Sequence, residues 1–242
     1  MNECTEPPSR RDIWKMFDLI SPTYDRVNRM ITLGLDQRWR KKMCTFLPDR
    51  PSLDVLDCAT GTGDQIIALM EQSPEIRAVV GLDLAEEMMA IGKKKIAPKS
   101  YADKVSFVTA SAEQLPFQDN SFDCVTISFG IRNIENFERA LSDFYRVLKA
   151  GGKALILEGT LPRNCLWKAF HLFYLRYLMP KIGGALSKQS GPYHYLNQTI
   201  ETFPQGEAFC SRMKNAGFAE VKAHPLLGGI VTIYEGTRHE AP

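Results

Sequence analysis

Short apolar runs alternate with amphipathic segments along most of the chain, and five of these runs have the length of buried strands. We expect strands at Leu53–Cys58, Ala78–Leu84, Val105–Ala110, Cys124–Ser128 and Lys153–Glu158. We expect helices at Gln65–Gln72, Ala85–Ile96, Phe137–Leu148 and Thr199–Gly217. Two last runs, Glu220–His224 and Gly229–Glu235, are spaced as a strand pair. The pattern predicts an α/β fold with a doubly wound, mostly parallel, seven-stranded sheet and an antiparallel C-terminal hairpin.

Two regions depart from this alternation. Arg11–Ile20 has the spacing of an amphipathic helix that ends at Ser21-Pro22, and Tyr24–Phe46 reads as further helix interrupted near Gly34. Between Gly159 and Pro204 the alternation of strand and helix patterns is interrupted, which indicates a helical insertion. We therefore expect a single domain over residues 1–242. Its parts are an N-terminal helical lid (1–50), a ligand-binding core (51–160), the insertion (160–204), and a C-terminal helix and strand pair (205–242).

Composition excludes several classes of protein. With 30 basic and 28 acidic residues the net charge is +2, which gives no general attraction to nucleic acid. The six cysteines include no C-x-x-C pair, so we expect no metal site and a reducing compartment. No secretory apolar segment and no run of about 20 apolar residues is visible. These features predict a cytoplasmic protein that is soluble, or at most peripheral to the inner face of a membrane.

The segment from Asp57 to Gly63 carries the first chemical signal. It joins a strand to a helix through a turn of small residues, and Asp83 follows twenty residues after Gly63, at the end of the next strand. This order places a ligand across the carboxyl ends of two parallel strands. A dinucleotide is disfavoured because Ile66 stands where the third glycine is needed, and no Gly-Lys-Ser/Thr follows. Gly61 allows close backbone approach, and Asp64 is expected to cap the helix.

The pattern D-x-A-x-G-x-G resembles the first motif of class I S-adenosylmethionine (SAM) methyltransferases. The resemblance implies that the turn containing Gly61 and Gly63 lies against the methionine part of SAM, and that Asp83 binds the ribose hydroxyls. The family usually has glycine where this chain has Ala59, a change from which we expect little cost. A G-x-G pair alone is also common in ordinary strand–helix turns, so Asp83 carries most of this interpretation.

Further segments resemble one family more closely, the quinone C-methyltransferases. They are ISFGIRN, RVLKAGGKALILEGT, and Tyr24-Asp25 with Asn28 and Trp39. The resemblance covers about Lys15 to Gly236 and implies methylation of demethylmenaquinol, or also of a ubiquinone precursor. The cofactor residues implied are Asp57, Gly61, Thr62, Gly63, Asp83, Ser111, Ala112 and Ser128. The chain departs from the family at Val27 (usually Met), Asp36 (usually His) and Gly159-Thr160 (usually aromatic-Ser).

Candidate catalytic residues lie in two places. Arg132 and Asn133 follow the fourth predicted strand, where a substrate would meet the methyl group, and Tyr24, Asp25 and Asn28 lie in the predicted lid. Arg132 is the candidate for polarising a phenol, directly or through a water, because its own pKa makes it a poor base. A salt bridge that anchors the loop is an equal alternative for Arg132. Packing under the lid is an alternative for Tyr24.

The insertion contains an almost wholly apolar stretch, Cys165–Met179. As a helix of about 22 Å it is too short to cross a bilayer of about 30 Å. It is either a buried helix, or a tunnel wall or membrane-facing patch for a prenyl tail. The predicted activity is SAM-dependent C-methylation of a prenylated quinol. The alternatives are methylation of a sterol, a phenol or a phospholipid amine, or a non-catalytic SAM- or quinone-binding subunit. A homodimer remains open.

Overall fold

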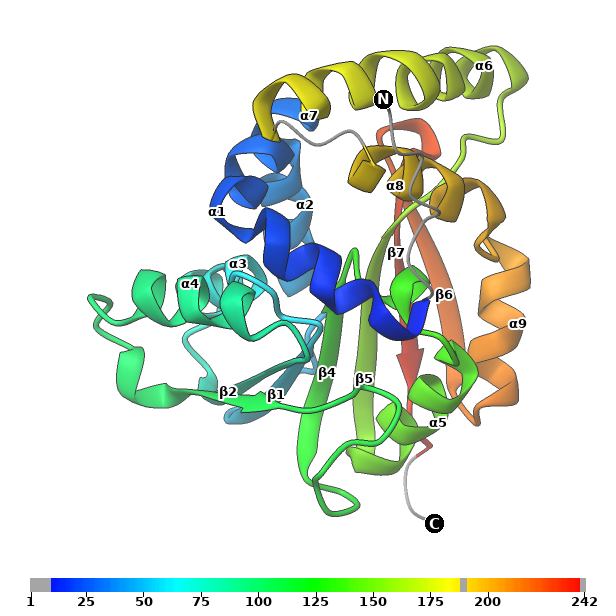
Figure 1. Ribbon diagram of the computed structural model, residues 1–242. Coiled ribbons are helices and arrows are strands. Elements are labelled where there is room, and N and C mark those ends of the chain that lie inside the picture. Colours follow the sequence, from blue (N-terminus) through cyan, green and yellow to red (C-terminus); the bar gives the residue numbers. More distant parts are fainter. Residues whose placement is uncertain (1–9, 188–190, 240–242) are drawn as a thin grey trace.

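A twisted seven-stranded sheet with helices on both faces forms the body of the computed structural model, which describes residues 10–187 and 191–239 (Figure 1). The strand order is β3-β2-β1-β4-β5-β7-β6. The strands are β1 Leu53–Cys58, β2 Ile76–Asp83, β3 Val105–Thr109, β4 Phe122–Ser128, β5 Leu148–Gly159, β6 Ala219–Leu226 and β7 Val231–Thr237. β1 to β5 pair in parallel, whereas β7 is antiparallel to β5 and to β6. The predicted sheet and C-terminal hairpin are confirmed.

Nine α-helices lie in the described part of the chain. They are α1 Ile13–Ile31, α2 Leu35–Cys44, α3 Asp64–Gln72, α4 Glu86–Ile96, α5 Phe137–Val147, α6 Cys165–Phe173, α7 Met179–Ser187, α8 Gly191–Thr202 and α9 Glu207–Asn215. α5 and α9 pack on one face of the sheet, and α2, α3 and the end of α4 pack on the other. Central β4 is buried along its whole length, as expected for a parallel strand covered on both sides. Cys58 and Cys124 are buried in these strands, as predicted.

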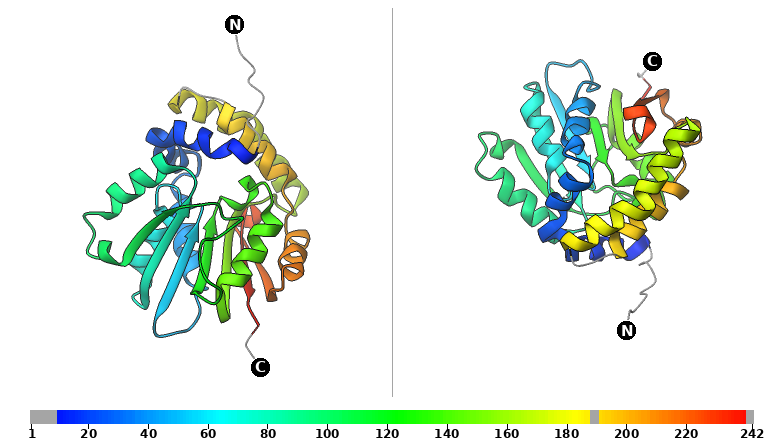
Figure 2. Two further views of the ribbon diagram at one scale, coloured as in Figure 1. Left: turned by 60° about the horizontal axis from the view of Figure 1, so that its bottom comes forward. Right: turned by 90° about the horizontal axis from the view of Figure 1, so that it is seen from above.

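The helices outside this body gather at one end. α1, α6, α7 and α8 lie over the carboxyl ends of the parallel strands, as Figures 1 and 2 show from three directions. The chain leaves β1 toward β2 and β3 on one side and returns to β4 on the other side. The carboxyl ends of β1 and β4 therefore flank the crevice in which open α/β sheets bind ligands. No helix in the described ranges is long and apolar enough to span a membrane.

Two predicted helix boundaries are wrong. α1 continues through Pro22, although proline removes a helical hydrogen bond, because α1 packs against α4 and α7 and buries Ile20 and Val27. The break comes only at Gly34, which takes a left-handed conformation (φ 75°), as the sequence suggested. The second error is the single helix expected over Thr199–Gly217. It is two helices, α8 and α9, separated at Pro204.

Candidate active site

Three connected cavities lie where the helices cover the strand ends. The apolar cavity, of about 370 Å³, is enclosed by α1, α2 and the α6–α8 region. The strand-end cavity, of about 340 Å³, lies over the ends of β2, β3 and β4. Tyr24, Phe129 and Asn133 line both of them. A narrow third space, the loop cavity, lies against the turn after β1 and shares Tyr24 with the other two.

The turn after β1 has the backbone that close ligand approach requires. Gly61 and Gly63 have left-handed φ angles of 52° and 76°. A Cβ at Gly63 would lie 3.5 Å from Cα of Gly92 and 3.3 Å from the side chain of Ile96, so the turn packs tightly on α4. Ala59 also adopts a left-handed φ of 48°. A side chain in this conformation is strained, so alanine at this position carries a cost that the sequence did not reveal.

Asp57 lies under this turn at the end of β1. Its carboxylate accepts hydrogen bonds from the hydroxyls of Thr60 at 2.7 Å and Thr126 at 2.6 Å. Burial raises the pKa of Asp57 to about 6, against the opposing effect of these two donors. Asp57 lines the loop cavity. A buried carboxylate with so high a pKa favours a cationic ligand group, which would hold it in its charged form.

Asp83 is the last residue of β2 and faces the strand-end cavity. One carboxylate oxygen accepts the backbone N–H of Gly61 at 2.7 Å, and the other accepts that of Ala85 at 3.0 Å. Burial raises the pKa of Asp83, although these backbone donors oppose the shift. A carboxylate has about four acceptor positions, so two remain for ligand hydroxyls. This geometry fits a ribose diol.

The other predicted cofactor residues divide into two groups. Ser111, Ala112 and Ser128 line the strand-end cavity. The hydroxyl of Ser111 accepts from the N–H of Glu113 at 3.2 Å, and that of Ser128 donates to Gln65 at 3.0 Å. Thr62 does not line this cavity. It borders the loop cavity, where it is buried and bound to the lid.

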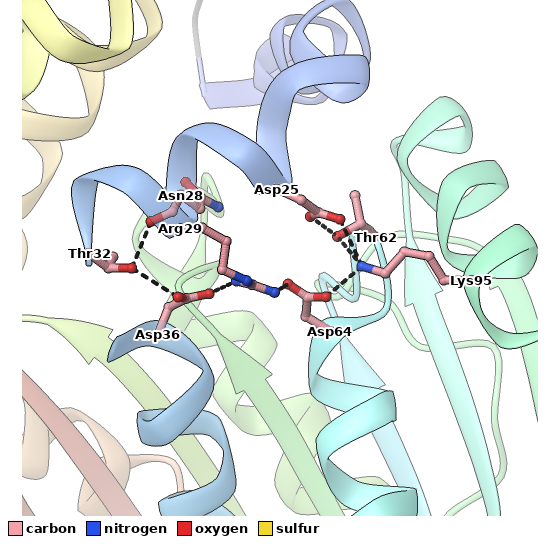
Figure 3. A network of polar contacts seen from close by, with 8 residues as sticks. All are labelled: Asp25, Asn28, Arg29, Thr32, Asp36, Thr62, Asp64 and Lys95. Carbon is pink, nitrogen blue, oxygen red and sulfur yellow. Dashed lines mark hydrogen bonds and ion pairs between the residues drawn. The ribbon is translucent and has the colours of Figure 1, made fainter. Parts of the chain in front are cut away.

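A chain of polar contacts joins the lid to the core (Figure 3). Asp25 of α1 accepts the Thr62 hydroxyl at 2.6 Å and pairs with Lys95 of α4 at 2.8 Å. Lys95 also pairs with Asp64, which in turn pairs with Arg29 at 2.7 Å. Asp25, a predicted catalytic residue, therefore lies in this network and does not line the apolar cavity among the described residues. We call this set the lid network.

The lid network contradicts the roles expected for Asp64 and Lys95, and it extends to Asp36, where the resembled family usually has histidine. Asp64 does not cap α3; the N-cap position is Gly63, and no side chain caps it. Burial acts to raise the pKa of Asp64, but the positive charges of Arg40, Lys95 and Arg29 hold it below its ordinary value. Lys95 belongs to a run that the sequence indicated as a solvated face, whereas it is half-buried here. Asp36 accepts from Thr32 at 2.9 Å and pairs with Arg29.

Arg132 and Asn133 form a short turn directly after β4, and both are buried. Arg132 pairs with the fully buried Glu158 and donates to the carbonyl of Phe129 at 2.8 Å. The anchoring salt bridge weighed for Arg132 is thus present, and its side chain also lines the apolar cavity. The amide oxygen of Asn133 is buried without a hydrogen-bond partner among the described residues.

Tyr24 and Asn28 face the apolar cavity from α1, and Tyr24 lines all three spaces. Burial raises the pKa of Tyr24, although Arg40, Asn28 and Arg132 oppose the shift. Its phenol therefore stays protonated at neutral pH and is able to donate a hydrogen bond. Both predicted residues thus lie where the two larger cavities meet or close to that point.

Sequence reasoning missed three polar residues of the site: Glu158, Gln65 and Arg40. Glu158 had a signal, because it is an acid at the end of an apolar strand. Arg40 had a weaker one, since it follows buried Asp36 by one helical turn on the same face of α2. Gln65 had none. Arg40 lines both the apolar and the loop cavity.

The apolar stretch of the insertion is not a buried helix. α6 has no buried residue, and the side chain of Leu166 is 80% exposed. Trp167, Phe170 and His171 nevertheless line the apolar cavity. The helix continues as a π-helical turn, Tyr174–Leu178, in which Leu175 is buried. The stretch is therefore a wall of the cavity that also presents an apolar surface. In the described part of the chain no cluster of side chains is arranged to hold a metal ion.

Solved structures share this fold. A methyltransferase from Methanococcus maripaludis described as putative and SAM-dependent superposes with a TM-score of 0.67 at 18% identity, covering 100% of this chain and 99% of that one. A SAM-dependent methyltransferase from Thermotoga maritima gives 0.66 at 20% identity, covering 93% and 99%. At these identities the likeness shows the fold.

Sequence relatives carry the comparison further. Demethylmenaquinone methyltransferase of Bacteroides fragilis is 42% identical over 226 residues, 93% of this chain and 91% of that protein. The ubiquinone/menaquinone biosynthesis C-methyltransferase UbiE of Geobacter sulfurreducens is 41% identical over 238 residues, 98% and 92%. Residues 5–238 match the model of the ubiE/COQ5 methyltransferase family. Because the family model matches nearly the whole length and the strand-end geometry agrees with it, the chain belongs to the ubiE/COQ5 methyltransferase family.

Proposed function

We propose that this protein transfers a methyl group from SAM to a ring carbon of a prenylated, demethylated quinol, demethylmenaquinol first of all and also the ubiquinone precursor. The observation that carries the proposal is the junction of two unlike cavities. The strand-end cavity, with Asp83, meets the apolar cavity of about 370 Å³. The residues that line both are Phe17, Tyr24, Phe129 and Asn133. A nucleoside fits the first and an isoprenoid-bearing ring fits the second, with the transferred methyl at the junction.

The residues present fit SAM. Asp83 has acceptor positions left for the ribose, and Ser111 and Ala112 border the space that an adenine ring would fill. The backbone of the Gly61 turn is bare on the cavity side, so a ligand can approach it closely. When bound, SAM supplies a methyl group on a sulfonium, an electrophile that needs only alignment with a nucleophile.

The chain's own residues then have to orient the ring and assist loss of the phenolic proton. Phe129 and Tyr24 form the walls between which the ring is held. Arg132, fixed by Glu158, presents a positive charge to the cavity that stabilises a developing phenolate. The free amide oxygen of Asn133 accepts a hydrogen bond from the phenolic O–H and orients it. Holding ring and methyl in line supplies much of the acceleration that such a reaction needs.

Labelled SAM tests the proposal, with demethylmenaquinol and the corresponding demethylated benzoquinol as acceptors. We expect label on the naphthoquinol, and loss of both turnover and SAM binding in Asp83→Ala. Arg132→Ala should lower turnover far more than SAM affinity; an equal loss of both would reduce Arg132 to an anchor. Transfer to neither acceptor despite SAM binding would favour another small-molecule substrate. Binding of quinol without transfer would favour a non-catalytic subunit.

The same proposal includes peripheral contact with the bilayer that holds the prenylated substrate, from the cytoplasmic side. Leu166, Phe170 and Phe173 project from α6 with more than half of each side chain exposed. The segment Cys165–Ser187 contains Lys168, Arg176 and Lys181 and no acidic residue. Exposed aromatic and aliphatic side chains beside cations are the pattern of a surface that lies on anionic lipid.

Flotation with anionic phosphatidylglycerol vesicles and neutral phosphatidylcholine vesicles tests this contact. We expect the protein to float with the anionic vesicles, and the combined change of Leu166, Phe170 and Phe173 to serine to abolish flotation. Leu19→Ser, an exposed leucine of α1, is the matched control. Flotation unchanged by the triple variant would remove α6 from the contact.

A further inference from the structure

Arg40 is a buried cation with no hydrogen-bonding or ion-pair partner in the part of the chain that the structure describes. Its residue is 8% exposed. The Nε atom is fully buried and unsatisfied. The guanidinium carbon lies 5.4 Å from the centroid of the Phe129 ring. The guanidinium group is therefore held in place by packing while its donors remain available.

Burial of an unpaired guanidinium group lowers the free energy of unfolding of the protein. A buried charge loses its hydration and regains that energy only from an opposite charge or from several hydrogen bonds. The other arginines at the site follow this rule, since Arg132 pairs with Glu158 and Arg29 pairs with Asp36 and Asp64. Asp57 and Asp64 are near enough for Arg40 to lower their pKa values, but their oxygens are bound by other residues. The missing partner of Arg40 is an anion that arrives with a ligand.

The position of Arg40 indicates which anion. Among the described residues that line the loop cavity, Arg40 is the one cation, and it lies there with Asp57 and the turn of Gly61 and Thr62. SAM carries a permanent carboxylate and a permanent ammonium on its methionine part. A neutral quinol carries no permanent charge. We propose that Arg40 binds the α-carboxylate of SAM.

This assignment rests on the proposed use of SAM and adds a consequence for the lid. Arg40 belongs to α2, whereas Asp83 and the Gly61 turn belong to the sheet. A single ligand would thus join α2 to the core by a charge-assisted bond. The same guanidinium also lines the apolar cavity, so the bound carboxylate neutralises a charge that would otherwise face an apolar acceptor.

Calorimetric binding separates the carboxylate from the rest of the ligand. The ligands are S-adenosylhomocysteine, its decarboxylated analogue, and 5′-methylthioadenosine, which lacks the whole amino-acid part. The wild type should bind the decarboxylated analogue about 10- to 100-fold more weakly than S-adenosylhomocysteine, the range for one charged hydrogen-bonded contact. Arg40→Met should weaken S-adenosylhomocysteine by the same factor and no longer discriminate between these two. Its affinity for 5′-methylthioadenosine should not change.

The controls distinguish the ways in which the proposal fails. Arg38→Met, an exposed arginine on the same helix, should bind every ligand like the wild type. Unchanged S-adenosylhomocysteine affinity in Arg40→Met with lower turnover would overturn the proposal and move Arg40 to the quinol. Equal weakening of all ligands would make Arg40 structural. If Arg40→Met does not fold, Arg40→Gln takes its place in the same comparison. A wild type that binds the decarboxylated analogue as tightly as S-adenosylhomocysteine would overturn the proposal without any variant. A wild type that binds none of them would overturn SAM use, and this assignment with it.

Discussion

The two larger cavities of this protein are built in different ways, although they share a wall. The strand-end cavity is made by residues within or next to the sheet, and backbone N–H groups hold its key carboxylate, Asp83. The apolar cavity is made largely by helices far apart in the sequence, from α1 to α8, with further lining from the segments after β4 and before β7. The first is fixed by local geometry and the second by tertiary packing. We call the strand-end cavity and its surroundings the cofactor side, and the apolar cavity and its surroundings the acceptor side. Substitutions in the helices of the acceptor side can therefore change its cavity without disturbing the sheet.

The largest expected effect comes from the buried ion pair between Arg132 and Glu158 on the acceptor side. Glu158→Gln leaves the charge of Arg132 buried and unpaired, so the free energy of unfolding should fall by about 3–5 kcal/mol. Urea denaturation measures the change. Replacing both partners, Arg132→Met with Glu158→Leu, should recover most of the loss. A small effect of Glu158→Gln would mean that the packing of the helices, without this ion pair, stabilises the acceptor side.

A slightly smaller effect is expected on the cofactor side. Burial raises the pKa of Asp57 from 3.8 to about 6, and two units correspond to about 3 kcal/mol. The folded pKa exceeds the unfolded one, so the stabilising contribution is full below pH 4 and is lost as the pH rises through 6. In ligand-free protein, the stability of Asp57→Asn relative to the wild type should therefore increase from pH 4 to pH 7 by that amount. A constant difference would contradict the raised pKa.

The lid network is a polar link between the two sides. Its contribution to the free energy of unfolding should be smaller than those of the Arg132–Glu158 pair and of Asp57. Lys95→Met removes one ion-pair partner each from Asp25 and Asp64, which are half-buried or better covered, and leaves Thr62 on Asp25 and Arg29 on Asp64. We expect a loss of about 1 kcal/mol, the upper end for partly exposed pairs. Hydrogen exchange of α1 should accelerate about fivefold relative to Lys94→Met, an exposed neighbour on the same helix. Equal exchange in both variants would show that apolar packing alone holds the lid.

The contrast between the two sides also explains how far the sequence could be interpreted. Gly61 and Asp83 follow from the order of strand, turn, helix and strand that ends in an acid. Ser111 and Ser128 follow from the family resemblance. The sheet and its hairpin follow from the same alternation. These features are local, so a pattern in the sequence is enough to predict them.

The acceptor side had no such local pattern. The sequence predicts a helix end at Pro22 because the packing of α1 against α4 and α7 is not visible in it. Asp25, Asp64 and Lys95 come together from three helices. The helix-capping role predicted for Asp64 and the solvated position predicted for Lys95 are therefore wrong. Arg40 lies among several basic residues, and only its burial distinguishes it. Contacts between distant segments determine all of these roles.

The smallest expected effect is at Ala59, whose backbone is strained although it lies on the cofactor side, next to the sheet. Its φ of 48° is left-handed, which costs an L-residue about 1–2 kcal/mol, while glycine loses about 0.5–1 kcal/mol of backbone entropy. Ala59→Gly should therefore raise the free energy of unfolding by about 0.5–1 kcal/mol in thermal or urea denaturation. Ala85→Gly, at a position with φ of −82°, is the control and should destabilise. If Ala59→Gly destabilises too, the methyl group of Ala59 contributes packing that outweighs its backbone strain, and the cofactor side depends on side-chain fit as the acceptor side does.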